Sequence, residues 1–142
     1  MPVLEQVLEK YPQDVKLVFK NFPLKNHSFA RPAAIAALAA SNQGKFWEFH
    51  DLLFKHYSQL NEQQFQRIAR DLNLDMDKFE KDQKDPTIQT MIAKDVSEGN
   101  KAGVRGTPTV FINGRRLKAR NLAGFQALID KELEKVSERR NR

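Results

Sequence analysis

The sequence predicts an α/β fold in a single domain of 142 residues. Three observations predict it: an apolar, strand-like run over 14–22, a long helical stretch, and a hairpin signal followed by a last helix. A chain of this length buries a core without disulfides or metals. We expect one domain over 1–142, with a helical insertion over about 28–102 and a C-terminal hairpin plus helix over about 106–137.

The first two elements are a helix and a strand. Apolar residues recur with helical spacing from Leu4 to Tyr11, after a proline at position 2. In the next run Val15, Leu17 and Phe19 alternate with other residues, as in a strand, and Val18 adds an apolar residue on the opposite face. This pattern predicts a strand that is covered on both faces.

The helical stretch divides into five predicted helices. Ser28 is placed to cap the first, which is rich in alanine from 33 to 40. A second, over 45–57, is apolar on more than one side and is expected to be sandwiched between neighbours, with Trp47 as packing. Asn61 and Gln64 form a capping box for the third. Two more follow over 75–84 and from Pro86 to a glycine stop at 103.

The hairpin signal lies between residues 108 and 119. Pro108 precedes the alternating run 109–112, and the dipeptide Asn113-Gly114 that follows is the strongest short-range signal for a type I′ turn. Proline lacks an N–H, so Pro108 must stand at the first position of a strand or at an edge. Asn121 is placed to cap a final helix, and we expect residues 137–142 to fray.

Positive charge is concentrated near this hairpin. The formal net charge is +6, and residues 99–120 contain six basic residues and no acid: Lys101, Arg105, Arg115, Arg116, Lys118 and Arg120. Such a stretch fits nucleic acid, an acidic lipid surface or an acidic polypeptide. The alternative is a solvated strand face whose charges discourage edge-to-edge pairing. The charges are not interleaved with stacking aromatic residues as in single-strand binders, so nucleic-acid binding is not the expected function. No apolar run is long enough for a membrane span.

Several kinds of reactive site are not predicted. The chain has no cysteine, which excludes disulfides, thiolate metal sites and thiol catalysis by these residues. His27, His50 and His56 lack the spacing of a helical metal pair and are expected in the core or on the surface. No catalytic triad, phosphate loop or carboxylate pair stands out. We therefore predict no catalytic residue, no metal and no cofactor.

Four segments resemble the DsbA-like thiol-disulfide oxidoreductases, a thioredoxin-fold branch with a helical insertion. They are PVLEQVLEKY from position 2, VKLVFKNFPL from 15, GKFWEFHDLLF from 44 and GVRGTPTVFING from 103. The resemblance runs from Pro2 to about position 133. It implies a cis bond before Pro108, and an extended polypeptide substrate bound by Arg105, Gly106, Thr107 and Pro108.

The resemblance also implies an incomplete fold. Proteins of this family begin with a central strand and a Cys-x-x-Cys motif at the first helix, whereas this sequence opens inside that helix. We therefore expect an N-terminally truncated, three-stranded mixed sheet with exposed edges. Three states would satisfy such edges: a collapsed three-stranded sheet, a homodimer that pairs edges, or a fragment that needs the missing segment in trans.

The predicted family activity is thiol-disulfide exchange between proteins, and this chain is predicted to be redox-inactive as given. Two alternatives stay open: a non-catalytic peptide-binding or assembly module, and a relative of the glutathione-dependent isomerases, whose serine would also precede Met1. The parent family works in the periplasm or elsewhere outside the cytoplasm, and no signal peptide is recognised in this sequence. Whether the cysteine segment was removed or is absent from the gene is left open.

Overall fold

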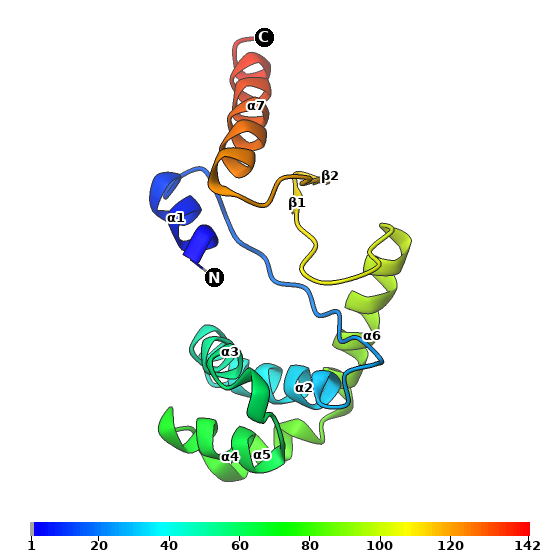
Figure 1. The fold of residues 1–142 in the computed structure, drawn as a ribbon. Coiled ribbons are helices and arrows are strands. Elements are labelled where there is room, and N and C mark those ends of the chain that lie inside the picture. Colours follow the sequence, from blue (N-terminus) through cyan, green and yellow to red (C-terminus); the bar gives the residue numbers. More distant parts are fainter. Residues whose placement is uncertain (1) are drawn as a thin grey trace. The chain divides into compact units, whose positions relative to one another are not determined.

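The computed structural model describes residues 2–142, which form two compact units. One contains the residues up to Phe19 together with Gly106–Arg142, and the other is Lys20–Arg105. Figure 1 follows the chain by colour through both units, from α1 to α7. The second unit contains the stretch expected as a helical insertion.

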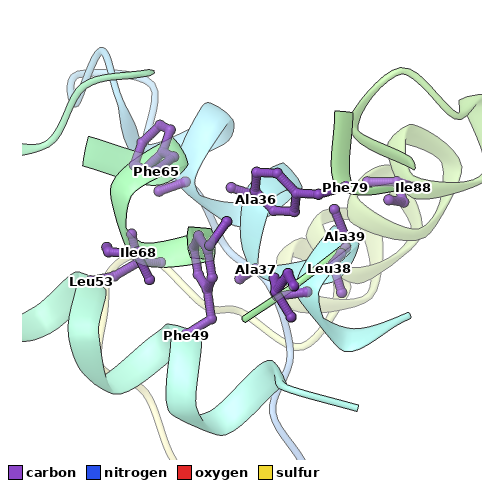
Figure 2. Close-up of a cluster of buried hydrophobic side chains, with 14 of the residues drawn as sticks. Ala36, Ala37, Leu38, Ala39, Phe49, Leu53, Phe65, Ile68, Phe79 and Ile88 are labelled. Atoms are coloured by element: carbon purple, nitrogen blue, oxygen red, sulfur yellow. The ribbon is translucent and has the colours of Figure 1, made fainter. Parts of the chain in front are cut away.

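The unit Lys20–Arg105 is organised around α2. Its elements are α2 (Ala30–Ser41), α3 (Phe46–Lys55), the 3-10 helix η1 (Tyr57–Gln59), α4 (Glu62–Asp71), α5 (Met76–Gln83) and α6 (Pro86–Lys101). Helix α2 contacts α3, α4, α5 and α6. Its small alanine side chains allow close approach, and the buried rings of Phe49, Phe65 and Phe79 lie around Ala36 and Ala37 (Figure 2).

The helix starts in this unit are partly as predicted. The Asn61 side chain accepts a hydrogen bond from the Gln64 N–H at 2.8 Å, which confirms the predicted cap of α4. The predicted Ser28 cap is wrong. The first bond of α2 runs from the Ala33 N–H to the Phe29 carbonyl, so Phe29 occupies the cap position and Ser28 lies before it.

Helix α3 is not sandwiched as predicted. Phe49 and Leu53 are buried against the core, but Trp47 is 43% exposed and Phe54 is 60% exposed. The Phe54 ring lies 4.7 Å from the ring of His50, which is buried, while most of Phe54 stays exposed. Within this unit, other helices cover α3 only on the side toward α2 and α4. The spacing of apolar residues along a helix does not show whether a second apolar side is buried or is an exposed group of aromatic side chains, and for this reason the prediction was wrong.

The predicted strand over 14–22 does not form, so the sheet within residues 2–142 has two strands and not three. Residues 15–22 have no regular secondary structure, and Val18, predicted to be covered, is 61% exposed. A strand requires a neighbour for its backbone groups, and none lies beside this run among residues 2–142. Side-chain chemistry anchors part of it instead: the backbone N–H and the side-chain amide of Asn21 both donate to Asp95 Oδ2 of α6 at 2.9 Å.

The other unit combines two helices with a hairpin. Its elements are α1 (Pro2–Lys10), β1 (Phe111–Ile112), β2 (Arg115–Arg116) and α7 (Leu122–Arg140). Val7, Leu117, Phe125 and Ile129 form its buried core with Tyr11. The predicted Asn121 cap is confirmed, because its side chain accepts from the Gly124 N–H. The predicted fraying from 137 is wrong: α7 continues to Arg140, and no glycine or proline occurs between Phe125 and Arg140 to end it earlier.

The hairpin turn has the predicted form. Asn113 and Gly114 have φ values of 48° and 78°, the two positive angles that a type I′ turn requires. The two strands pair antiparallel, with Phe111 opposite Arg116 and Ile112 opposite Arg115.

Glu132 of α7 holds this hairpin in place. Its Oε1 accepts from Lys135 Nζ at 2.8 Å and from Arg115 Nε of β2 at 2.9 Å, while its side chain is only 13% exposed. The hydrogen bond from Lys135, together with Arg115 and the Asn113 side chain, keeps the pKa of Glu132 below its ordinary value of 4.5.

Tyr11 connects the end of α1 to α7. Its hydroxyl donates to Asp130 Oδ1 at 2.7 Å. The carboxylate favours the protonated hydroxyl, and this bond, aided by desolvation, raises the pKa of Tyr11 from 10.0 to about 12.

Glu132→Gln should loosen the hairpin, because the neutral amide loses the charge that holds Arg115. We expect hydrogen exchange of the Leu117 amide to accelerate about two- to fivefold by NMR, the range of a partly exposed ion pair. In the wild type the stabilisation is complete above pH 4.5 and is lost as the pH falls through the lower pKa of folded Glu132. Glu134→Gln, on the same helix but exposed, is the control. Equal exchange in the two variants would contradict this role.

Tyr11→Phe should remove a pH dependence at the alkaline end. The pKa of Tyr11 is higher in the folded state, so its stabilisation is complete below pH 10.0 and is lost as the pH rises toward about 12. Urea denaturation over this interval should show the free energy of unfolding falling more steeply in the wild type than in Tyr11→Phe. Parallel pH profiles for the two proteins would show that the Asp130 bond contributes nothing.

Candidate functional site

Residues 106–109, which lead into the hairpin, accept two side-chain hydrogen bonds at their backbone carbonyls. Thr109 Oγ1 donates to the Gly106 carbonyl at 2.7 Å. Arg120 Nη1 donates to the Pro108 carbonyl at 2.8 Å, from the far side of the hairpin. The peptide bond between Thr107 and Pro108 is cis. The two ends of the hairpin are therefore tied together beside Pro108.

The hairpin has one covered face and one open face. Side chains alternate along a strand, so Val110 and Ile112 lie on the same face of the hairpin. Leu117, which follows β2, lies on this face too, and all three belong to the core of this unit. Phe111 and Arg116, which lie opposite each other, occupy the other face and are exposed. This open face carries the candidate site.

The outer edge of β1 presents backbone groups that β2 does not use. The Leu117 N–H donates to the Val110 carbonyl at 2.9 Å, which makes these residues a hydrogen-bonded pair. In an antiparallel ladder such pairs alternate with non-bonded ones, so the N–H and C=O of Phe111 and Thr109 point away from β2. The sheet has only β1 and β2 among the described residues, and no third strand meets this edge there.

A hollow of about 340 Å³ lies among residues from both sides of the hairpin. Its lining residues come from the entering segment and from the strand that leaves the hairpin: Pro108, Thr109, Val110, Arg116, Leu117, Lys118 and Arg120. Three of them are cationic and none is acidic. Arg120 bonds to a neutral carbonyl, so its charge is not neutralised there.

The residues predicted as a binding site are found on the surface around this segment. Arg105, Thr107 and Pro108 are exposed, and Gly106 is half-buried. Gly106 accepts the hydrogen bond from Thr109, and Pro108 accepts the one from Arg120. Arg105 belongs to the other compact unit.

Two features of the site were not predicted. Arg120 was recognised only as part of a basic run, and exposed strand edges were predicted without naming Phe111 as a residue whose backbone groups point outward. The alternation over 109–112 together with the Asn-Gly turn would have predicted which backbone groups point outward. No sequence signal indicates that Arg120 reaches the Pro108 carbonyl.

No second reactive centre appears among residues 2–142. The described residues contain no group of three histidine or acidic side chains that could hold a metal ion. His50 is buried with its Nδ1 at 3.3 Å from Asp51 Oδ1, while His56 is half-buried and His27 is exposed. Within the described part of the chain, none of the helices has the length and apolar character needed to cross a membrane.

Curated relatives of this chain include Na⁺/H⁺ antiporters. It is 41% identical over 116 residues to Na(+)/H(+) antiporter NhaA 3 of Salinispora tropica, a match that covers 81% of this chain and 18% of that protein. It is 32% identical over 108 residues to Na(+)/H(+) antiporter NhaA of Herminiimonas arsenicoxydans, covering 76% of this chain and 17% of that protein. The chain thus spans less than a fifth of the length of these relatives.

Among solved structures, the chain is similar to a thioredoxin-like oxidoreductase from Silicibacter pomeroyi DSS-3. The TM-score is 0.82 at 27% sequence identity, and the match covers 94% of this chain and 77% of that one. This similarity supports a thioredoxin-like fold, here with mostly helices and a small two-stranded antiparallel sheet.

The family comparison agrees with the structural one. Residues 2–131 match the sequence model of the family described as Thioredoxin. Together with the structural similarity, this confirms the resemblance to DsbA-like proteins of the thioredoxin fold. The chain belongs to the thioredoxin family.

Proposed function

We propose that this chain is a polypeptide-binding unit of the thioredoxin family that supplies no thiol chemistry of its own. The observation that carries the proposal is the open edge of β1, where the backbone groups of Thr109 and Phe111 point away from β2. An extended peptide adds to such an edge as a further strand, with its backbone supplying affinity and its side chains supplying specificity.

The surroundings of this edge support the same reading. Arg120 and Thr109 restrain the backbone of the entering segment, so little freedom is lost there when a peptide binds. Thr107 and Pro108 are exposed beside the edge and are proposed as contacts of the incoming strand, with Gly106 and Arg105 next along the chain.

Thiol-disulfide exchange cannot be performed by the residues of this chain. The reaction requires a thiolate that attacks a disulfide sulfur, and the sequence has no cysteine. The structural relative is described as an oxidoreductase. For this chain we propose polypeptide binding without a redox reaction. The ion exchange of the antiporters is not carried over, because the chain matches less than a fifth of their length.

The chain should not catalyse disulfide reduction. In an insulin turbidity assay with dithiothreitol we expect the rate of buffer alone, because no residue can form the mixed disulfide. Thioredoxin serves as the positive control. A rate above buffer would show a reductive chemistry that this proposal does not contain.

Phe111→Pro should weaken peptide binding. Proline removes the outward N–H of this residue but not a bond of the β1–β2 ladder, so the hairpin is expected to persist. We expect the dissociation constant of an extended peptide, measured by NMR titration, to rise about three- to tenfold relative to Phe111→Ala, which loses the ring but keeps the N–H. The amides of Thr109 and Phe111 should shift more than that of Ile112 in the wild type.

Equal affinity of the two variants, or shifts confined to the helical unit, would overturn strand addition at β1. A homodimer that pairs strand edges would occupy the same backbone groups. Light scattering at the assay concentration identifies that case, and a stable dimer that excludes the peptide would replace the proposal.

A further inference from the structure

We infer that the hollow in the hairpin is a binding site for a phosphate monoester, held by Arg116, Lys118 and Arg120. The inference goes beyond the proposed function and does not depend on it, because it uses none of the backbone groups at the outer edge of β1. Its basis is the gathering of three cationic side chains around one hollow that no described acidic residue lines.

The cations of the hairpin differ in whether the fold neutralises them. Arg115 is paired with Glu132 of α7 at 2.9 Å. Arg116 and Lys118 are exposed, and within residues 2–142 neither of them forms an ion pair. Both line the hollow, so their charges are available to a ligand there.

Arg120 supplies a guanidinium that is already held at the same hollow. Its Nη1 donates to the Pro108 carbonyl at 2.8 Å. A carbonyl carries no net charge, so the guanidinium stays positive, and its other N–H groups remain to bind an anion. Because this side chain is held in advance, less entropy is lost when an anion binds to it.

A phosphate monoester matches this arrangement better than a carboxylate does. It carries a charge of about −1.5 to −2 at pH 7 and three acceptor oxygens, so one group can accept from several cations at once. A guanidinium binds two such oxygens in parallel, and an ammonium adds a compact positive charge. The volume of about 340 Å³ lies within the range of about 300–1,000 Å³ of small-molecule sites, so the alcohol part of the ester also has room, beside Pro108 and Thr109.

Polymeric anions fit the hollow less well. Single-stranded nucleic acid binds through aromatic side chains on which its bases stack, and none of the described residues that line the hollow is aromatic. Each carboxylate of an acidic polypeptide brings one charge and two oxygens, which is less than the three cations can bind.

The test titrates glycerol 3-phosphate and inorganic phosphate into the wild-type chain and two double variants, at constant ionic strength. Arg116→Gln with Lys118→Gln removes two of the cations without breaking an ion pair within the described residues. Arg139→Gln with Arg140→Gln, at the exposed end of α7, makes the same change in charge and is the control. Backbone amide shifts measured by NMR report binding, acetate is the comparison anion, and circular dichroism verifies that all three proteins are folded.

We expect the wild type and the α7 control to bind both phosphates in a saturable way, about tenfold more tightly than the hairpin variant does. The shifts should centre on residues 116–120, and acetate should bind much more weakly because of its smaller charge. Equal affinity of the three proteins for phosphate, or acetate binding as tight as phosphate binding, would overturn the inference and leave strand addition at β1 untouched.

Two further probes identify the source of the phosphate group. Phosphatidylcholine vesicles that contain phosphatidic acid, whose headgroup is a phosphate monoester, are offered to the same three proteins. Vesicle binding that the hairpin variant lacks and glycerol 3-phosphate displaces would assign the site to a lipid headgroup, whereas binding of the soluble ester alone would assign it to a small molecule. A thymidine oligonucleotide that binds through Arg116 and Lys118 more tightly than either monoester would overturn the inference in favour of nucleic acid.

Discussion

The hydrogen bond from the Leu117 N–H to the Val110 carbonyl sets the register on which the candidate site depends. Because strands alternate with period two, this one pairing places Val110 and Leu117 in the core and leaves Phe111 on the open face. It also decides which backbone groups of β1 are used by β2 and which point outward. A register shifted by one residue would bury Arg116 and expose Leu117, at a large cost in free energy.

The hairpin keeps this register through contacts outside the two short strands. Glu132 holds Arg115 from α7, and Arg120 returns to the Pro108 carbonyl. Two-stranded hairpins are marginal on their own, so such contacts supply the order that a wider sheet would otherwise provide. They also restrain the surface where a peptide would be held, which lowers the entropy lost on binding.

In this chain the family fold is retained without the family's reactive group. A thioredoxin-like enzyme joins two capacities, a thiolate that exchanges electrons and an edge that holds the substrate backbone. The sequence has no cysteine for the first, and we propose the second at the hairpin that β1 begins.

The sequence alone was sufficient for the order of the helices, the type I′ turn and the caps at Asn61 and Asn121, because these depend on neighbouring residues and local backbone geometry. It was not sufficient for the start of α2 or the end of α7. It predicted the family through motifs spread along the chain. Only the tertiary structure decided that 14–22 forms no strand, since an alternating pattern does not say whether another strand lies beside it. The same holds for the candidate site: the basic run was visible, but which cations are paired, and which backbone groups of β1 remain open, depends on residues distant in sequence.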